Sequence, residues 1–359
     1  MTEKNAKRKS RSQCITVQSA SSSGRVTGFR PGSVITTTTR YELKRQIATG
    51  GMGSIYEAEQ HGAVGFVKTV AIKLLLPEIS EDEEFVSMFI GEAKLVAGLV
   101  HQNIVQMYQL GRSDDGYFIA MEYIDGIDLE QFMARHQELD RTVPVELVSY
   151  IASRICRGLE YAHSKTDENG ERLDIVHRDV SPRNIMVTNE GEVKLTDFGV
   201  AKARRIVADK LNDCMMVGKI PYMSPEQATY KDTDKKSDIF SLGVVFYELL
   251  TGERIFERDS ESDAIDGIVN GEIPPVEGFR QGVPQELVDI LMRCLARSPA
   301  ERFRSAGEVG YELERHMYSK GYGPTIVTLA KYTAEIFPEK RFYEAASRGD
   351  DLNSSILRK

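Results

Sequence analysis

Five side chains occur along the chain in an order that could handle a phosphate group. They are Lys73, Glu92, Asp179, Asn184 and Asp197. A lysine can hold a phosphate, carboxylate and amide oxygens can bind Mg²⁺, and a further carboxylate can orient a hydroxyl that attacks phosphorus. Each of these residues alone has an ordinary explanation on a protein surface. Together they predict a site that moves a phosphoryl group by positioning it and neutralising its charge.

A glycine-rich segment, residues 49–53 (TGGMG), precedes these side chains. Glycines between two strands allow backbone N–H groups to approach phosphate oxygens closely. A tight hairpin turn would explain the same glycines. The segment therefore indicates a phosphate-binding loop only in combination with the residues that follow it. The common phosphate-loop spacing GxGxxG keeps Gly50 and Gly53, but its first glycine falls at Ala48.

Lys73 and Glu92 are expected to form an ion pair that holds the lysine against the phosphates. Lys73 ends an apolar strand segment, residues 70–73 (VAIK), and Glu92 follows 19 residues later. A helix is expected around Glu92, because Ser80 and Glu83 have the spacing of a capping box. Apolar residues then recur at helical spacing, at Phe85, Phe89, Ala93 and Val96.

The second half of the site is expected in two short segments. Residues 177–184 (HRDVSPRN) contain Asp179 and Asn184, and residues 197–199 (DFG) begin 18 residues after Asp179. A strand, residues 193–195 (VKL), comes just before Asp197. The two segments in this order and at this separation, with Lys73 and Glu92 upstream, are a specific signature of phosphoryl transfer.

The elements that must position these residues change in type along the chain. From Tyr41 to about Tyr123 the pattern predicts mainly strands, at 41–43, 54–60, 69–75 and 117–123. Beyond this point it predicts mainly helices, clearest at 147–163, 238–250, 285–295 and 305–316, with a short amphipathic helix at 326–337. We expect the last helix to pack on the helical part. A small β-rich unit followed by a larger helical one would leave a cleft between them.

With these motifs in place, residues 41–317 resemble the Hanks-type protein kinases, and the phrasing GGMG and SPEQ is most similar to bacterial, especially myxobacterial, Ser/Thr kinases. The resemblance implies an α+β, two-lobed fold with a small β-rich N-lobe (about 41–123) and a larger helical C-lobe (about 124–317). It also implies a serine/threonine protein kinase that transfers the γ-phosphate of ATP to protein substrates. The expected cofactors are ATP and Mg²⁺, with Mn²⁺ as an alternative ion.

The resemblance assigns roles residue by residue. Asp179 would be the catalytic base, and Asn184 and Asp197 would bind the metal. Glu226 would pair with Arg302, and Asp238 would brace the catalytic loop. The nucleotide would be held by residues of the glycine-rich loop, the neighbouring strands and the linker between the lobes: Ile47, Ala48, Gly50, Gly51, Gly53, Ile55, Ala71, Lys73, Met121, Glu122, Ile124 and Met186.

The sequence departs from the family around Asp179. Ser181 stands where Ser/Thr kinases usually have lysine, and Lys219 stands where they usually have threonine. We therefore expect an exchange in which Lys219 supplies the cation at the transferred phosphate and Ser181 the hydroxyl. The alternative is that Lys219 faces solvent and the site is weaker. Arg183 is a second candidate cation, and it is also typical of tyrosine kinases.

The segment between Gly199 and Gly218 contains no Ser, Thr or Tyr. A phosphate that orders this loop through Arg178 therefore has no acceptor there. Asp209 or Asp213 could act as a permanent anion for Arg178, or both could be ordinary solvated acids. Ala48, Ser181 and Lys219 leave one alternative function, a pseudokinase that binds nucleotide as a scaffold without efficient turnover.

Bulk composition limits the remaining expectations. Residues 1–40 carry +7 of net charge and 14 Ser or Thr, so we expect a disordered tail, and the remainder carries −15. The positive residues are too dilute to favour nucleic acid as a partner. No apolar segment of membrane-spanning length occurs, and four widely spaced cysteines favour a reducing, cytoplasmic location. The expected partners are protein substrates and an upstream regulatory protein, and residues 318–359 are expected to be a C-terminal extension.

Overall fold

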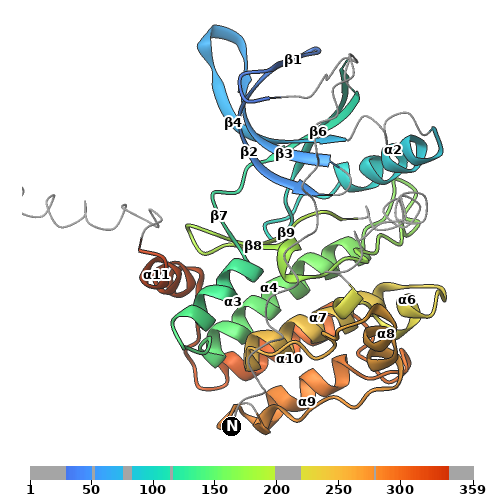
Figure 1. Cartoon of the computed structure of the whole chain (residues 1–359), viewed down its shortest axis with the longest axis vertical. Coiled ribbons are helices and arrows are strands. Elements are labelled where there is room, and N and C mark those ends of the chain that lie inside the picture. Colours follow the sequence, from blue (N-terminus) through green and yellow to red (C-terminus); the bar gives the residue numbers. More distant parts are fainter. Residues whose placement is uncertain are drawn as a thin grey trace, which may run out of the picture.

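The computed structural model describes residues 30–50, 53–75, 83–113, 116–198, 220–278 and 280–338. Figure 1 shows two stacked lobes, of which the upper is mainly sheet and the lower mainly helix. The expected α+β, two-lobed architecture is therefore confirmed. The order of elements along the chain also follows the expected change from strands to helices.

The N-lobe is an antiparallel sheet with the strand order β1-β2-β3-β4-β6-β5. Its strands are β1 (Val34–Thr36), β2 (Arg40–Gly50), β3 (Gly53–His61), β4 (Val67–Leu75), β5 (Met107–Ser113) and β6 (Gly116–Glu122). Apolar side chains that alternate along these strands, such as Tyr41, Leu43 and Ile72, form a separate small core. This sheet fixes the position of Lys73 on β4.

The expected tail boundary at residue 40 is wrong for residues 30–40. Strand β1 pairs with β2 through the partners Val34–Glu42, Ile35–Tyr41 and Thr36–Arg40. The Ile35 side chain is buried and belongs to the N-lobe core. One apolar residue and a set of backbone hydrogen bonds are enough to order this strand, although the average composition of the segment predicts disorder.

The helix expected between the third and the next strand is α2 (Glu83–Ala97). Phe89 and Ala93 are buried on the face that packs toward the sheet, as their spacing predicts. Ser80, the expected cap, lies outside the described residues. Glu92 lies within α2, but its side chain is also outside the described part.

The C-lobe is built from helices α3 (Leu129–Glu138), α4 (Val145–His163), α6 (Pro225–Ala228), α7 (Lys235–Thr251), α8 (Glu261–Asn270), α9 (Gln285–Cys294) and α10 (Ala306–Tyr318). The helices expected at 147–163, 238–250, 285–295 and 305–316 are confirmed as α4, α7, α9 and α10. Helix α7 is buried along nearly all of its surface. It is the central element on which the lobe packs.

A second sheet of three strands lies at the junction of the lobes. Its strands are β7 (Gly126–Asp128), β8 (Ile185–Thr188) and β9 (Val193–Leu195), in the order β7-β8-β9. The catalytic loop enters β8, and Asp197 lies two residues after the end of β9. Register pairs such as Ile185–Leu195 therefore bring the two halves of the predicted site to one edge of the cleft.

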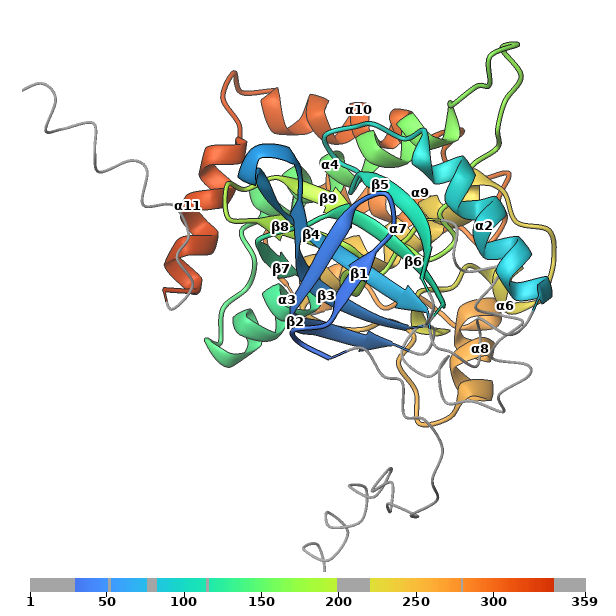
Figure 2. The same cartoon turned by 90° about the horizontal axis from the view of Figure 1, so that it is seen from above.

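The helix expected at 326–337 is confirmed as α11 (Ile326–Ile336), and it packs on the C-lobe. Figures 1 and 2 both place it beside α3 and away from α2. Arg135 Nε donates to the carbonyl of Ile336 over 2.8 Å, and His136 Nε2 lies 2.8 Å from the Tyr332 hydroxyl. Gly191 (φ +84°) is in contact with α11, since a Cβ there would lie 2.2 Å from the Ile326 carbonyl oxygen.

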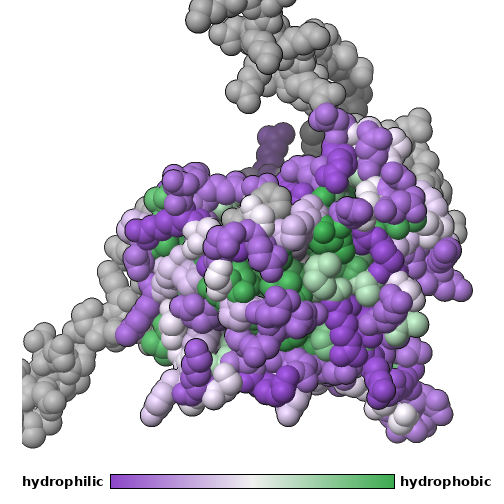
Figure 3. Space-filling view, turned by 90° about the horizontal axis from the view of Figure 1, so that it is seen from below, coloured by the Kyte–Doolittle hydropathy of each residue, from purple (hydrophilic) through white to green (hydrophobic). Residues whose placement is uncertain are grey.

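The sequence predicts no membrane span, and the molecular surface and the helices can be compared with that expectation. The face seen from below has mostly hydrophilic side chains around a smaller hydrophobic area (Figure 3). Among the described residues, no helix is both long enough and apolar enough to cross a membrane. The longest apolar-rich run of the sequence, residues 239–250, lies in the core helix α7, and its burial inside the C-lobe explains it.

Candidate active site

Lys73 and Asp197 meet in the cleft although 124 residues separate them. Lys73 Nζ lies 2.5 Å from Asp197 Oδ1, and the two side chains are 7% and 16% exposed. A charge-assisted hydrogen bond between largely buried groups is strong and well oriented. The pairing of Lys73 with Glu92 stays a prediction, because the Glu92 side chain lies outside the described residues.

The backbone around Asp197 is held in an uncommon conformation. Asp197 has φ +58°, in the left-handed region that residues other than glycine seldom occupy. The segment is anchored by His177, whose Nε2 lies 2.9 Å from the Thr196 carbonyl oxygen and whose ring packs 4.3 Å from that of Phe198. Burial lowers the pKa of His177, so its imidazole is neutral at pH 7. Such conformations persist where surrounding contacts fix them, as they do here.

Asp179 and Asn184 are joined directly. Asn184 Nδ2 donates to both the backbone oxygen and the Oδ2 atom of Asp179, each over 2.7 Å. The Thr196 N–H donates to the Asn184 carbonyl over 2.9 Å, which ties this loop to the segment that carries Asp197. Because the Asn184 amide nitrogen serves Asp179, its amide oxygen is the atom that can bind a cation.

The predicted brace at Asp238 is confirmed. Its carboxylate is fully buried and accepts the backbone N–H of His177 over 2.8 Å and that of Arg178 over 2.7 Å. His163 Nε2 lies 2.7 Å from the same carboxylate. Burial alone would raise the pKa of Asp238, but the hydrogen bonds from His163 and the backbone hold it below its ordinary value. The charged carboxylate therefore fixes the start of the catalytic loop, where Arg178 has φ +61°.

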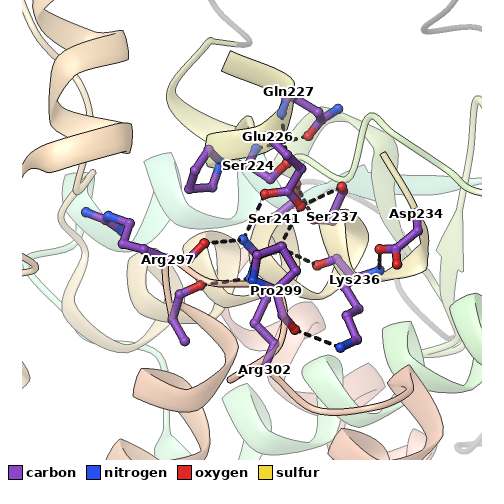
Figure 4. A network of polar contacts seen from close by, with 12 residues as sticks. Ser224, Glu226, Gln227, Asp234, Lys236, Ser237, Ser241, Arg297, Pro299 and Arg302 are labelled. Atoms are coloured by element: carbon purple, nitrogen blue, oxygen red, sulfur yellow. Dashed lines mark hydrogen bonds and ion pairs between the residues drawn. The ribbon is translucent and has the colours of Figure 1, made fainter. Parts of the chain in front are cut away.

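The predicted ion pair between Glu226 and Arg302 is also confirmed (Figure 4). Arg302 makes two hydrogen bonds to the Glu226 carboxylate, of 2.7 and 2.9 Å, and both side chains are buried. Ser237 donates to the same carboxylate over 2.7 Å. The other Arg302 N–H groups donate to the carbonyls of Ala296, Lys236 and Arg297. The pair links α6 to the chain before α10.

Helix α6 connects this ion pair to the catalytic loop. Ser224 and Gln227 form a capping box at its start. The Gln227 side chain also donates to the Arg178 carbonyl over 2.9 Å, and Figure 4 shows Gln227 next to Glu226. A chain of contacts therefore runs from the buried Arg302 to the residue before Asp179.

A pocket lies behind Lys73, between the N-lobe sheet, α2 and β9. It is lined by Lys73, Phe89, Ala93, Val96, Val105, Met107, Ile119, Met121, Leu195, Asp197 and Phe198. Met121, an expected nucleotide contact, therefore lines the same pocket as Lys73 and Asp197. The Glu122 N–H donates to the Gln106 carbonyl over 2.8 Å, so a hydrogen bond between the Glu122 backbone and adenine would have the Glu122 carbonyl as its acceptor. The Glu122 carboxylate is paired with Lys194 at 2.9 Å.

Among the described residues, the other expected nucleotide contacts do not line this pocket. Ile55 on β3 is the register partner of Lys73, Ala71 is buried on β4, and Met186 is in β8. Ile47 and Ala48 are exposed on β2, and Ile124 follows β6. These positions are compatible with a nucleotide between the lobes.

The glycine-rich loop is described only in part. Gly50 and Gly53 are register partners at the ends of β2 and β3, and Gly51 lies outside the described residues. A Cβ at Gly53 would lie 1.9 Å from the Leu74 carbonyl oxygen. Close packing of β3 on β4 therefore explains this glycine without a phosphate.

Of the residues expected to differ from the family around Asp179, the structure describes Ser181 and Arg183 but not Lys219. Ser181 is 3% exposed, and its hydroxyl has no hydrogen-bond partner among the described residues. Lys219, Asp209 and Asp213 lie outside the described part. Arg183, the second candidate cation, instead pairs with Glu130 at 2.6 Å.

Sequence reasoning missed one partner of Arg178. The Arg178 Nε atom donates to the Thr233 hydroxyl over 3.3 Å. No spacing signal connects these residues, which are 55 positions apart. Arg178 therefore has a hydroxyl partner outside the segment that lacks Ser, Thr and Tyr.

The family model described as "Protein kinase domain" matches residues 41–310. This chain belongs to the protein kinase family. A crystal structure of the PknI kinase domain of Mycobacterium tuberculosis has a similar fold, with a TM-score of 0.60, 27% identity and coverage of 80% of this kinase and 99% of that chain. The end of the domain near residue 317 stays a prediction.

Curated relatives identify the kinase as a bacterial, Hanks-type one, as the motifs predict. It is 38% identical to "Tyrosine-protein kinase MasK" of Myxococcus xanthus, over 85% of this chain and 47% of that protein. It is 34% identical to "Serine/threonine-protein kinase PrkC" of Bacillus subtilis, over 77% and 40%, and 34% identical to "Serine/threonine-protein kinase PknB" of Mycobacterium tuberculosis, over 82% and 46%. The kinase thus spans less than half the length of these relatives.

Proposed function

We propose that this chain is an active protein kinase that transfers the γ-phosphate of ATP to serine or threonine hydroxyls of proteins. The observation that carries the proposal is the meeting of Lys73, Asp197, Asn184 and Asp179 at one edge of the cleft. Phosphoryl transfer needs little covalent chemistry from the protein and depends on positioned charges. A scaffold without turnover would not need all four groups in place.

Each of these residues has a task that its position supports. Asp179 accepts the proton of the acceptor hydroxyl or orients that hydroxyl toward phosphorus. Asn184 keeps the Asp179 carboxylate fixed through its 2.7 Å hydrogen bond. Lys73 balances phosphate charge from the floor of the cleft. Because Asp238 and His177 hold the two loops rigidly, these groups need little rearrangement when substrate arrives.

A divalent cation fits the donor set at this site. The Asp197 carboxylate and the Asn184 amide oxygen are hard oxygen ligands, which Mg²⁺ prefers, and the Thr196–Asn184 hydrogen bond holds their segments together. When bound, Mg²⁺ supplies charge neutralisation for the phosphates. Mn²⁺ has the same ligand preference. The residues therefore fit ATP with either ion, with Mg²⁺ as the proposed cofactor.

The exchange of Ser181 and Lys219 remains part of the proposal. The buried Ser181 hydroxyl lacks a hydrogen-bond partner among the described residues, and such groups usually have one. A partner supplied by Lys219 or by the substrate phosphate would satisfy it. Arg183 is a weaker candidate for the cation at the phosphate, because Glu130 engages its guanidinium.

The choice of serine or threonine over tyrosine rests on the relatives. PrkC and PknB are named serine/threonine kinases, whereas MasK is named a tyrosine kinase. Three peptides that differ only in the acceptor residue, which is Ser, Thr or Tyr, are incubated with the chain and radiolabelled ATP. We expect label on the Ser and Thr peptides. Phosphoamino-acid analysis of the products is the measurement. Label on the Tyr peptide alone would overturn the serine/threonine proposal and leave the kinase proposal intact.

The setting of the kinase is also proposed. Cys156 and Cys294 are buried free thiols, which supports a reducing, cytoplasmic location. Protein substrates follow from the proposed activity. An upstream regulatory protein is proposed because the segment between Gly199 and Gly218 has no phosphorylatable residue.

A further inference from the structure

The charged residues between the catalytic loop and α3 carry an inference about substrates, which rests on the proposed kinase function. Arg183 lies in the short 3-10 turn Pro182–Asn184, four residues after Asp179. The next residue, Asn184, is hydrogen-bonded to Asp179. A protein segment that presents a hydroxyl to Asp179 must therefore pass close to the Arg183 side chain.

Arg183 is only partly engaged within the protein. Its Nε lies 2.6 Å from Glu130 Oε2, and its side chain is 64% exposed. Within the described part of the chain, its two terminal amino groups have no hydrogen-bond or ion-pair partner. A guanidinium offers five N–H donors in a planar fork that matches a carboxylate or phosphate. The open end of Arg183 can therefore accept a bidentate anion from outside.

The acidic groups of the same surface are already matched with arginine. Glu130 also lies 3.5 Å from Arg254, and Arg254 pairs with Glu248 at 2.9 Å and Glu257 at 3.0 Å. Burial raises the pKa of Glu248, and its second oxygen accepts the Tyr222 hydroxyl over 2.6 Å.

Asp128, another acid near this surface, caps α3 by accepting the Gln131 N–H over 2.7 Å. A basic side chain from a substrate that approached Glu130, Glu248 or Glu257 would have to displace an arginine that belongs to the protein. An acidic side chain would not.

We propose that Arg183 selects protein substrates that carry an anionic side chain within a few residues of the acceptor hydroxyl. The shared chemistry is a carboxylate or a phosphate, either of which can accept two parallel N–H bonds from the guanidinium. Because the contact is the same before and during transfer, it lowers KM more than it raises kcat. The positions read by Arg183 are those that approach the turn Pro182–Asn184.

Matched peptides test this proposal. One Ser-containing peptide is made with Asp, phosphoserine, Ala or Lys at each flanking position, and kcat and KM are measured with the full chain. We expect kcat/KM for the Asp peptide to exceed that of the Lys peptide by about tenfold at one or more positions. Arg183→Gln should bring the ratio close to one, and Arg183→Glu should reverse it. The Asp and phosphoserine arms tell whether a carboxylate suffices.

Arg304→Gln is the matched control, because Arg304 is an exposed arginine just before α10. It should leave the ratio unchanged. A preference for Lys peptides, or an Asp preference that survives Arg183→Gln, would overturn the proposal. So would a fall in kcat for all peptides with an unchanged ratio, since that result assigns Arg183 a structural role.

A binding measurement separates this inference from the kinase proposal. Fluorescence anisotropy with the Asp179→Asn chain reports peptide affinity without turnover. Tighter binding of the Asp peptide than of the Lys peptide supports the inference even if no phosphate is transferred. Equal binding of both peptides overturns it, whether or not the wild-type chain proves to be an active kinase.

Discussion

Asp197→Asn is expected to lower phosphate transfer by about 10³-fold while leaving the fold intact, because it removes the carboxylate that pairs with Lys73 and that we propose as a metal ligand. An amide has the same size but carries no charge. It can neither neutralise Lys73 nor bind Mg²⁺ strongly. The rate of transfer from radiolabelled ATP and the circular dichroism spectrum are the two measurements.

The proposed role of Asp197 as a metal ligand predicts a further property of this variant. Its residual activity should rise with Mg²⁺ at concentrations where the wild-type chain is already saturated. Asp289→Asn is the control, because Asp289 is an exposed acid on α9. Near-normal activity of Asp197→Asn, with ordinary Mg²⁺ dependence, would show that the Lys73–Asp197 pair is not the phosphate site.

Arg302→Met is expected to cause the largest loss of stability. It leaves the buried Glu226 carboxylate with its Ser237 hydrogen bond but without its cation. Removing one partner of a buried ion pair costs about 3–5 kcal/mol. For a domain of this size, we expect the melting temperature to fall by roughly 10 °C. Thermal unfolding followed by circular dichroism measures it.

The pH dependence of this loss follows from the pKa of Glu226. Burial alone would raise that pKa, but Arg302 and Ser237 hold it below its ordinary value. The pair therefore stabilises the wild-type chain above the ordinary pKa of a glutamate, and the stabilisation is lost as pH falls through the folded-state value. In Arg302→Met, protonation relieves the unpaired charge, so the two melting temperatures should converge as pH falls from 7 toward 5.

Two controls make the Arg302 result specific. The double variant Glu226→Gln with Arg302→Met removes both charges and should recover most of the lost stability. Arg304→Met removes an exposed arginine two residues away and should change little. If Arg302→Met melted like the wild type, the Glu226–Arg302 pair could not be the anchor of α6.

The candidate active-site residues Lys73, Asp179 and Asp197 were predictable because their motifs occur along the chain in an order that is typical of protein kinases. The same holds for the Glu226–Arg302 pair and the Asp238 brace, which followed from a resemblance extending over most of the chain. Long amphipathic or buried helices such as α4 and α7 were also predictable, since their apolar spacing is regular.

Other elements were missed for two different physical reasons. Strand β1 has one buried side chain, Ile35, and is otherwise held by its pairing with β2, and a composition average conceals a single buried residue. Helices α3 and α8 did carry signals, namely the caps Asp128 and Ser260, which accept backbone N–H groups. A search for short capped helices would have found both.

Contacts between distant residues could not be read from spacing. Arg183 was expected near the transferred phosphate, but Glu130, 53 residues earlier, engages it. Arg178 bonds to Thr233 in the same unpredictable way. These partners depend on how the loops between β7, β8 and α7 are placed, which only the folded chain determines.

The central claim is that Asp179, held by Asn184, directs a hydroxyl at the γ-phosphate. The most direct test compares wild-type chain and Asp179→Asn in transfer of radiolabelled γ-phosphate from ATP to a generic protein substrate, with ATP affinity measured in parallel. We predict transfer by the wild type and a rate about 10²- to 10⁴-fold lower for the variant, at similar ATP affinity. Equal transfer by both chains, or no transfer by the wild type, would contradict the account.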